Sequence, residues 1–355
     1  MNAKLSEFTG SAPVIAMLGM CKNAGKTKAL NRLIYEYQLP GRSIAVTSVG
    51  RDGERTDLVT GTDKPPIYMH RGMLAATASD LLPLSDVSRE ILDVTDIATP
   101  LGIVVVFKAR SDGYAQLAGP SIIEDLSRLI KRLHGFGAET VIIDGAMNRR
   151  SPAAGALDGA CVLCTGASLN KDMGIVVSET AFVCKLLTLP ERRTDITRPG
   201  EQWDFGIRNS EFGISDKDIG MMRGQHSRRY TVLYSDNALD TDTVEDLCTI
   251  LKRSCPESIF FSGAFTESAA RAIMQSGAKI DGLLFIVEDS SKILLAKETF
   301  EKLQGRSAGF MVKRSTMLAA VTINPISAGG WRFDADIFLE EMKRAANVPV
   351  LNVGK

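Results

Sequence analysis

Near its start the chain joins an apolar stretch to a helical stretch through a glycine–lysine–threonine sequence. The run Val14–Gly19 predicts a buried strand, and the segment Lys26–Tyr37 predicts a helix. Gly25, Lys26 and Thr27 lie where the two elements meet. Because a strand followed directly by a helix is the repeating unit of layered α/β domains, this junction points to an α/β fold.

The same junction predicts a site for a polyphosphate chain. Backbone N–H groups of a tight turn, together with the positive end of a helix, can surround phosphate oxygens. Gly25 permits close approach of the backbone, Lys26 would reach the β- and γ-phosphates, and the Thr27 hydroxyl would hold Mg²⁺. The residues expected to bind the nucleotide are Cys21, Lys22, Asn23, Ala24, Gly25, Lys26, Thr27 and Lys28.

The glycine spacing departs from the usual phosphate-loop pattern, which has four residues between its glycines. Here five residues separate Gly19 from Gly25, and Met20 stands where the first glycine is expected. The alternative interpretation is a glycine turn before an amphipathic helix, with Lys26 on the surface.

Two acidic residues follow predicted strands and are expected to complete the site. Asp144 ends the strand Thr140–Asp144, where a carboxylate can bind Mg²⁺ directly or through water. Asp52 follows the strand Ser43–Val49 and would orient Mg²⁺ or the attacking water, with Glu54 as the second choice. We therefore expect Lys26, Asp52 and Asp144 to act in catalysis and Thr27, Asp52 and Asp144 to bind the metal. The alternatives are a turn residue at position 144 and a charged, hairpin-like loop around position 52.

Short apolar runs alternate with helical stretches along the whole chain, which predicts mostly parallel sheets with crossover helices. Expected strands in the second half are Tyr230–Tyr234, Ser258–Ser262, Gly282–Val287, Gly309–Lys313, Leu318–Ile323 and Val348–Val353; in the first half Gly102–Lys108 and Ala160–Thr165 join those already named. Expected helices are Met73–Leu82, Ser121–His134, Gly174–Leu186, Thr243–Lys252 (with Asp242 as its cap), Glu267–Gln275, Ser291–Leu303 and Ala335–Arg344. A polar, glycine-rich stretch then divides the chain into a P-loop nucleotide-binding domain (1–190), a linker or long loop (191–229) and a second α/β domain (230–355).

Composition excludes several other classes of protein. The 42 basic residues equal the 42 acidic residues, so no net field favours nucleic acid or an anionic membrane. No apolar run approaches the roughly 20 residues that cross a bilayer, and the N-terminal residues lack the pattern of a signal peptide. We therefore expect a cytoplasmic protein with no nucleic-acid or membrane partner.

The cysteines favour packing over chemistry. Six in 355 residues are too few for a disulfide scaffold. Cys161 and Cys164 form a CxxC sequence inside an apolar strand, where residues three apart point to opposite faces, so buried thiols are expected in place of a metal site. Cys21 differs because it lies in the phosphate loop, although a redox role is disfavoured.

The sequence defines less well which base of the nucleotide would be bound. Asn170-Lys171-Asp172 is similar to the guanine-reading Asn-Lys-X-Asp sequence but lacks its spacer. ATP is therefore the expected nucleotide. The segment Thr165–Asn170 follows a strand at the presumed ligand edge and would line either the nucleotide or a coupled site.

The loop resembles the Gly-Thr-Asp-Thr-Glu-Val-Gly-Lys-Thr loop of dethiobiotin synthetase and its relatives among P-loop proteins. Those relatives also carry an acidic residue followed by Gly-Ala at the end of a later strand, as Asp144-Gly145-Ala146 does here. The chain as a whole resembles the smaller, P-loop component of the lysine 5,6-aminomutase reactivase, or its ornithine aminomutase counterpart. The segments that carry this resemblance are Gly19–Thr27, Thr47–Glu54, Ser262–Ala264 and Val321–Pro325.

That resemblance implies an ATP-driven component that restores an adenosylcobalamin-dependent aminomutase. Such mutases lose activity when the cofactor loses its adenosyl group, and the reactivase would release the damaged cobalamin and admit an intact one. The implied partners are a MutS-like ATPase and the mutase, and the implied cofactors are ATP and Mg²⁺. Two alternatives stay open: an ATP-dependent ligase of the dethiobiotin or cobyric acid synthetase kind, and a nucleotide-binding scaffold that does not hydrolyse ATP.

Overall fold

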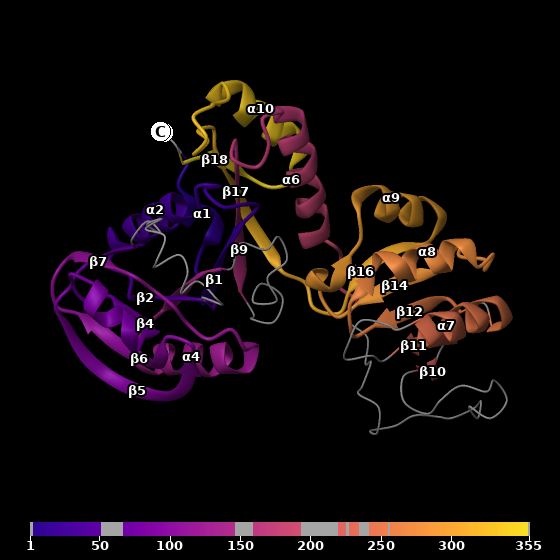
Figure 1. Ribbon diagram of the computed structural model, residues 1–355, viewed down its shortest axis with the longest axis horizontal. Coiled ribbons are helices and arrows are strands. Elements are labelled where there is room, and N and C mark those ends of the chain that lie inside the picture. The colour runs from indigo at the N-terminus through magenta and orange to yellow at the C-terminus, as the bar shows by residue number, and fades with distance from the viewer. Residues whose placement is uncertain are drawn as a thin grey trace. The chain divides into compact units, whose positions relative to one another are not determined.

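The computed structural model describes residues 3–50, 67–145, 159–192, 219–224, 227–233, 241–254 and 256–353. The chain divides into two compact units, of which the first comprises residues 1–185 and 316–355 and the second residues 186–315. Both units are mixed α/β, and the expectation of a large, mostly parallel sheet is confirmed (Figure 1).

Nine strands among the described residues form the sheet of the first unit, in the order β18-β17-β9-β1-β8-β2-β4-β6-β5. Neighbours from β18 to β4 pair in parallel, whereas β6 is antiparallel to both β4 and β5. The strands are β1 (Val14–Gly19), β2 (Ile44–Ser48), β4 (Leu74–Ala78), β5 (Arg89–Thr99), β6 (Gly102–Ala109), β8 (Thr140–Asp144), β9 (Ala160–Gly166), β17 (Met317–Asn324) and β18 (Val350–Asn352). A separate antiparallel pair consists of β3 (Ile67–Met69) and β7 (Gly113–Ala115).

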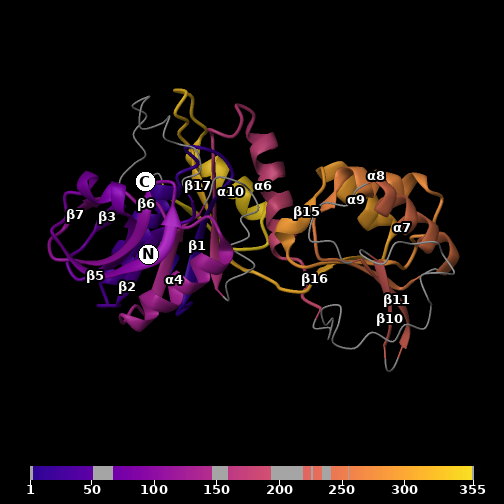
Figure 2. The same ribbon diagram turned by 60° about the horizontal axis from the view of Figure 1, so that its bottom comes forward.

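The two faces of this sheet carry different hydrophobic cores. Ile142 of β8 packs in the core that includes Leu30 and Leu33 of α2. Its neighbours Val141 and Ile143 pack in the core of α4. Successive side chains of a strand point to opposite faces, so β8 is covered by α2 on one side and α4 on the other. Helices α2 and α4 flank the sheet of this unit in Figure 1, and Figure 2 shows the same sheet turned by 60°. Helices of this unit are α1 (Leu5–Thr9), α2 (Lys26–Gln38), α4 (Ile123–Gly135), α6 (Met173–Leu187) and α10 (Ala335–Ala345).

The second unit is built on a five-stranded sheet in the order β10-β11-β12-β14-β16. Its strands are β10 (Ile219–Gly224), β11 (Ser227–Leu233), β12 (Ser258–Phe261), β14 (Leu284–Val287) and β16 (Gly309–Val312), all parallel except β10. Helices α7 (Thr241–Ser254), α8 (Glu267–Gln275) and α9 (Lys297–Arg306) and the small pair β13 (Phe265–Thr266) and β15 (Ile293–Leu294) complete it. The phenylalanine side chains 261, 265, 285, 300 and 310 stack on one another in its core. In the described parts of both units, no helix combines the length and the apolar character that crossing a bilayer requires.

The structure corrects the expected second domain, 230–355. Strands β17 and β18 belong to the first unit, because β17 pairs with β9 along its length from Met317 to Asn324. The second unit is therefore an insertion between two neighbouring strands of the first sheet. Of the expected linker 191–229, residues 193–218 and 225–226 lie outside the described residues, whereas residues 219–224 and 227–229 fall in β10 and β11.

Three local predictions are also wrong. The expected helix Met73–Leu82 is instead β4 followed by the 3₁₀ helix η1 (Ser79–Leu84), since pairing with β2 and β6 overrides the helix preference of its alanines. Helix α9 begins at Lys297, six residues later than expected, because residues 290–294 form the 3₁₀ turn η3 (Ser290–Lys292) and the short strand β15. Asp242 lies inside α7, which begins at Thr241.

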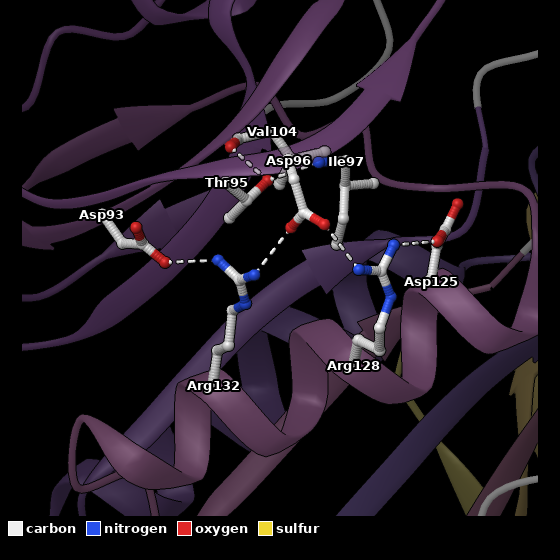
Figure 3. Close-up of polar contacts among 8 residues, drawn as sticks. All are labelled: Asp93, Thr95, Asp96, Ile97, Val104, Asp125, Arg128 and Arg132. Carbon is white, nitrogen blue, oxygen red and sulfur yellow. Dashed lines mark hydrogen bonds and ion pairs between the residues drawn. The ribbon is translucent and has the colours of Figure 1, made fainter.

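Ion pairs fasten α4 to the edge strand β5 (Figure 3). Arg132 bonds to Asp93 at 2.8 Å and to Asp96 at 2.6 Å. Arg128 bonds to Asp96 and to Asp125, each at 2.6 Å. The hydrogen bond from Arg128 lowers the pKa of Asp96. The edge strand β5, which the sequence pattern did not reveal, thus pairs with β6 through its backbone and is tied to α4 through its acidic side chains.

Replacing Arg132 by methionine removes two of these ion pairs while the stem of the side chain is kept. We expect the melting temperature to fall by roughly a few degrees at low salt, and the loss to shrink in about 1 M salt because screening weakens exposed pairs. The lowered pKa of Asp96 means that the network's contribution is present above the ordinary aspartate pKa of 3.8 and is lost as the pH falls further. Arg344→Met is the control, because it breaks one 2.7 Å pair with Glu341 inside a single helix. Equal, salt-independent losses in the two variants would contradict a fastening role.

Candidate phosphate-binding site

The loop predicted to bind phosphate, called the phosphate loop below, runs from the end of β1 at Gly19 to the start of α2 at Lys26. Two of its residues have positive φ angles: Asn23 (62°) and Gly25 (93°), the residue that caps α2. A Cβ atom on Gly25 would lie 2.9 Å from Cβ of Asn324. Both the backbone conformation and the packing therefore require glycine at position 25.

The side chain of Lys26 points to the end of the neighbouring strand β8. Its ammonium lies 2.9 Å from Oδ1 of Asp144 and also donates a hydrogen bond to the carbonyl of Gly145. The Lys26 side chain is 14% exposed and that of Asp144 only 2%, so each charge depends on the other in a largely dry environment. Lys26 is therefore not a solvated surface residue, and Asp144, which ends β8, pairs with it.

The strand register explains why these two residues meet. Strands β1 and β8 pair in parallel with Met17 opposite Asp144, so both carboxyl ends reach the same edge of the sheet. The carbonyl of Asp144 accepts hydrogen bonds from the Ser48 hydroxyl and the Val49 amide, which ties the end of β2 to the same place. A Cβ atom on Gly145 would lie 2.5 Å from the carbonyl oxygen of Met17, so this crossing of backbones also requires glycine.

The other predicted loop residues differ in exposure. Ala24 is buried; Cys21, Gly25 and Thr27 are partly buried; and Lys22, Asn23 and Lys28 are exposed. Thr27 lies in the first turn of α2, whose amide groups have no acceptor within the helix. The arrangement thus presents helix-terminal N–H groups, a hydroxyl, an ammonium and a carboxylate at one edge of the sheet. This combination suits an anion and a hard cation bound together.

Several predicted residues fall outside the part of the chain that the structure describes. Asp52 is one of them, with Glu54 and the flanking Arg51 and Arg55, and so is Ala146. Within the described ranges no cluster of three or more His, Cys, Asp or Glu side chains could hold a metal ion alone. Mg²⁺ at a nucleotide site commonly takes one or two protein oxygens and completes its shell with phosphate and water. Thr27 and Asp144 therefore remain the described candidates.

The guanine-like sequence Asn170-Lys171-Asp172 has a structural role. The carboxylate of Asp172 accepts hydrogen bonds from the amides of Gly174 at 2.7 Å and Ile175 at 3.3 Å, at the start of α6. Lys171 places its ammonium 5.2 Å from the centre of the Trp331 ring. The carboxylate that would read guanine is thus used at the helix start.

Sequence reasoning missed one member of the site, Asn324. It ends β17, is 7% exposed, and donates a hydrogen bond of 3.2 Å from Nδ2 to the carbonyl of Asn23 in the loop. The signal was present as Asn-Pro at the end of an apolar strand. The sequence did not indicate that this residue lies beside the loop, because β17 was expected in the second domain.

The CxxC cysteines are buried thiols, as expected. Cys164 packs in the core beneath α2. Burial raises its pKa to about 11, although the charge of Lys26 opposes the shift. Burial likewise raises the pKa of Cys184 to about 12 and that of Cys161 further. All three are therefore protonated at neutral pH.

Alkylation of the native protein should distinguish these thiols from Cys21, which is partly exposed in the loop. We expect iodoacetamide at pH 8 to leave Cys161, Cys164 and Cys184 unmodified, since only the exposed thiolate reacts. Labelling mapped by mass spectrometry checks this, and the same reaction in denaturant, where every thiol should react, is the control. Rapid native labelling of any of the three buried thiols would contradict their assignment to the core.

No family model matches the chain, and neither a curated protein nor a solved structure matches it. The 2.9 Å contact between Lys26 and Asp144 is accordingly the principal observation on which a function can be based.

Proposed function

We propose that the first unit is a P-loop NTPase domain that binds ATP with Mg²⁺ at the end of β1. The observation that carries this proposal is the 2.9 Å contact between the ammonium of Lys26 and the carboxylate of Asp144, beside a left-handed glycine that opens a helix. Phosphate oxygens are bound by a cationic side chain and by donor amides, and Mg²⁺ is bound by carboxylate or hydroxyl oxygens. The chain places both sets of groups at one edge of the sheet.

The residues present fit the nucleotide and its metal. Gly25 and Gly145 keep the backbone free of side chains where close approach is required. Lys26 and the amides of the first turn of α2 would hold the phosphates, and Thr27 and Asp144 would hold Mg²⁺. The metal would neutralise phosphate charge and position the phosphate oxygens. The chain's own part is to orient the phosphates and to replace the Lys26–Asp144 pair by contacts with the ligand.

We further propose that nucleotide binding serves the reactivation of an adenosylcobalamin-dependent aminomutase together with a MutS-like ATPase. Support for this step is the resemblance in sequence carried by the loop, by residues 47–54 and by Val321–Pro325. Physically, ATP and ADP must stabilise different conformations, because a ligand shifts an equilibrium only through its differential affinity. Lys26, Thr27 and Asp144, together with Asp52, are the residues proposed to sense the γ-phosphate.

Replacing Lys26 by methionine removes the ammonium but keeps the aliphatic stem. We expect the affinity for MgATP, measured by calorimetry, to fall roughly a hundredfold, since charge-assisted hydrogen bonds contribute about 1.5–3 kcal/mol each. Asp144→Asn should mainly reduce the dependence of binding on Mg²⁺. The double variant Lys26→Met/Asp144→Asn controls for folding, because it leaves neither buried charge without its partner. Unchanged affinity in Lys26→Met would remove the loop from the nucleotide site.

The proposed role and its two alternatives differ in what stimulates ATP turnover. We expect phosphate release to rise when a cobalamin-dependent aminomutase containing damaged cofactor is added with the MutS-like partner. Stimulation by a carboxylate substrate, with ADP and a ligated product, would favour the synthetase alternative. Tight binding of ATP without turnover under any of these conditions would favour the scaffold. The Lys26→Met variant is the negative control, because any ATP turnover that persists with this variant comes from another ATPase.

A further inference from the structure

Asn324, the last residue of β17, contacts the phosphate loop, which follows β1. Its Nδ2 donates to the carbonyl of Asn23 over 3.2 Å, although the two residues are 301 positions apart in the chain. Asn23 is a non-glycine residue with a positive φ angle of 62°. A bond to the carbonyl of such a residue stabilises a backbone conformation that costs free energy by itself. Asn324 therefore favours the turn in which the loop is ready for phosphate.

The packing of Asn324 against Gly25 is a second contact between this residue and the phosphate loop. Its Cβ atom fills the space that a side chain at position 25 would need, since a Cβ on Gly25 would approach it to 2.9 Å. Asn324 thus packs against Gly25, the left-handed residue that caps α2, and also bonds to the carbonyl of Asn23. Contacts with Asn23 and Gly25 place it directly against the turn that precedes Lys26.

Asn324 is itself held firmly in place. Its carbonyl accepts a hydrogen bond of 2.9 Å from the amide of Ala167, which follows β9. A Cβ atom on Gly166 would lie 2.5 Å from that same carbonyl, so the two backbones are in close contact. Trp331 adds a further bond between the two segments, because its indole Nε1 donates to the carbonyl of Ala167 at 2.9 Å.

The segments 166–172 and 324–333 thus form one platform, defined here by these two ranges. Within it Ser168 accepts a hydrogen bond from the amide of Ala328 at 3.3 Å, and the amide of Phe333 donates to the carbonyl of Pro325 at 2.9 Å. A platform with this many internal bonds can support the asparagine at a fixed distance from the loop.

We propose that Asn324 is a positioning residue that holds the phosphate loop in its binding conformation from this platform. The proposal rests on the proposed nucleotide-binding function and assigns Asn324 to the phosphate end of the ligand. An asparagine at a strand end can also read a nucleobase, but the amide nitrogen here is directed to Asn23, and its Oδ1 lies 3.4 Å from the amide of Ile326. Phosphate affinity, and not base selectivity, is therefore the property that Asn324 controls.

The test replaces Asn324 by leucine, which has nearly the same shape and lacks the amide. Binding of ATP and of inorganic tripolyphosphate, each with Mg²⁺, is measured by calorimetry. We expect both affinities to fall by a similar factor, roughly three- to tenfold, the effect of one lost hydrogen bond. The melting temperature and circular dichroism of the variant show that it is folded. Asn31→Leu is the matched control, because Asn31 accepts its hydrogen bond from the amide of Tyr68 in β3.

Each outcome of this test has a distinct meaning. A loss of ATP affinity with unchanged tripolyphosphate affinity would assign Asn324 to the base and overturn the proposal. Unchanged affinity for both ligands, or equal losses in Asn31→Leu, would overturn it as well. A wild-type protein that binds neither ligand would instead contradict the proposed function itself. Asn324→Ser, which is too short to reach Asn23, should reproduce the loss if the leucine variant fails to fold.

Discussion

The contact between Lys26 and Asp144 is the constraint on which the first unit depends. The Asp144 carboxylate is only 2% exposed, and burying a charge without a cation or hydrogen-bond donors beside it costs free energy. The parallel pairing of β1 with β8 meets this requirement, because it places the start of α2 beside the end of β8. It also fixes Gly145, where a side chain would collide with β1. The same groups that satisfy one another here are those that a phosphate and a divalent cation would use.

Parallel pairing explains how residues far apart in the sequence converge on this edge. The carboxyl ends of β2, β8, β1, β9 and β17 follow one another in the sheet, and each is followed by a segment with polar groups or glycine. A one-residue shift in any pairing would turn the strand's side chains to the opposite face and exchange the two cores. The apolar packing against α2 and α4 thus sets the register, and the register sets the site.

Much of this could be predicted from the sequence, for identifiable reasons. Strands β1 and β8 were predicted to the residue, because continuous apolar runs bounded by glycine or a charge have few other interpretations. Lys26 and Asp144 could be chosen because each follows such a run. Strand β4 was mistaken for a helix because its alanines favour a helix, and only its pairing with β2 and β6 overrides that preference. The edge strand β5 was missed, since its polar side chains are held by ion pairs to α4 that no periodicity reveals.

The membership of β17 could not be predicted from local pattern, and it changes how the two units are understood. The chain leaves the first sheet through α6, forms the whole second unit, and returns directly into β17. One end of that strand therefore continues the second unit, and its other end carries Asn324 against the phosphate loop. Among the described residues, β17 is the shorter of the two covalent links between this sheet edge and the inserted unit, since the other link runs through α6.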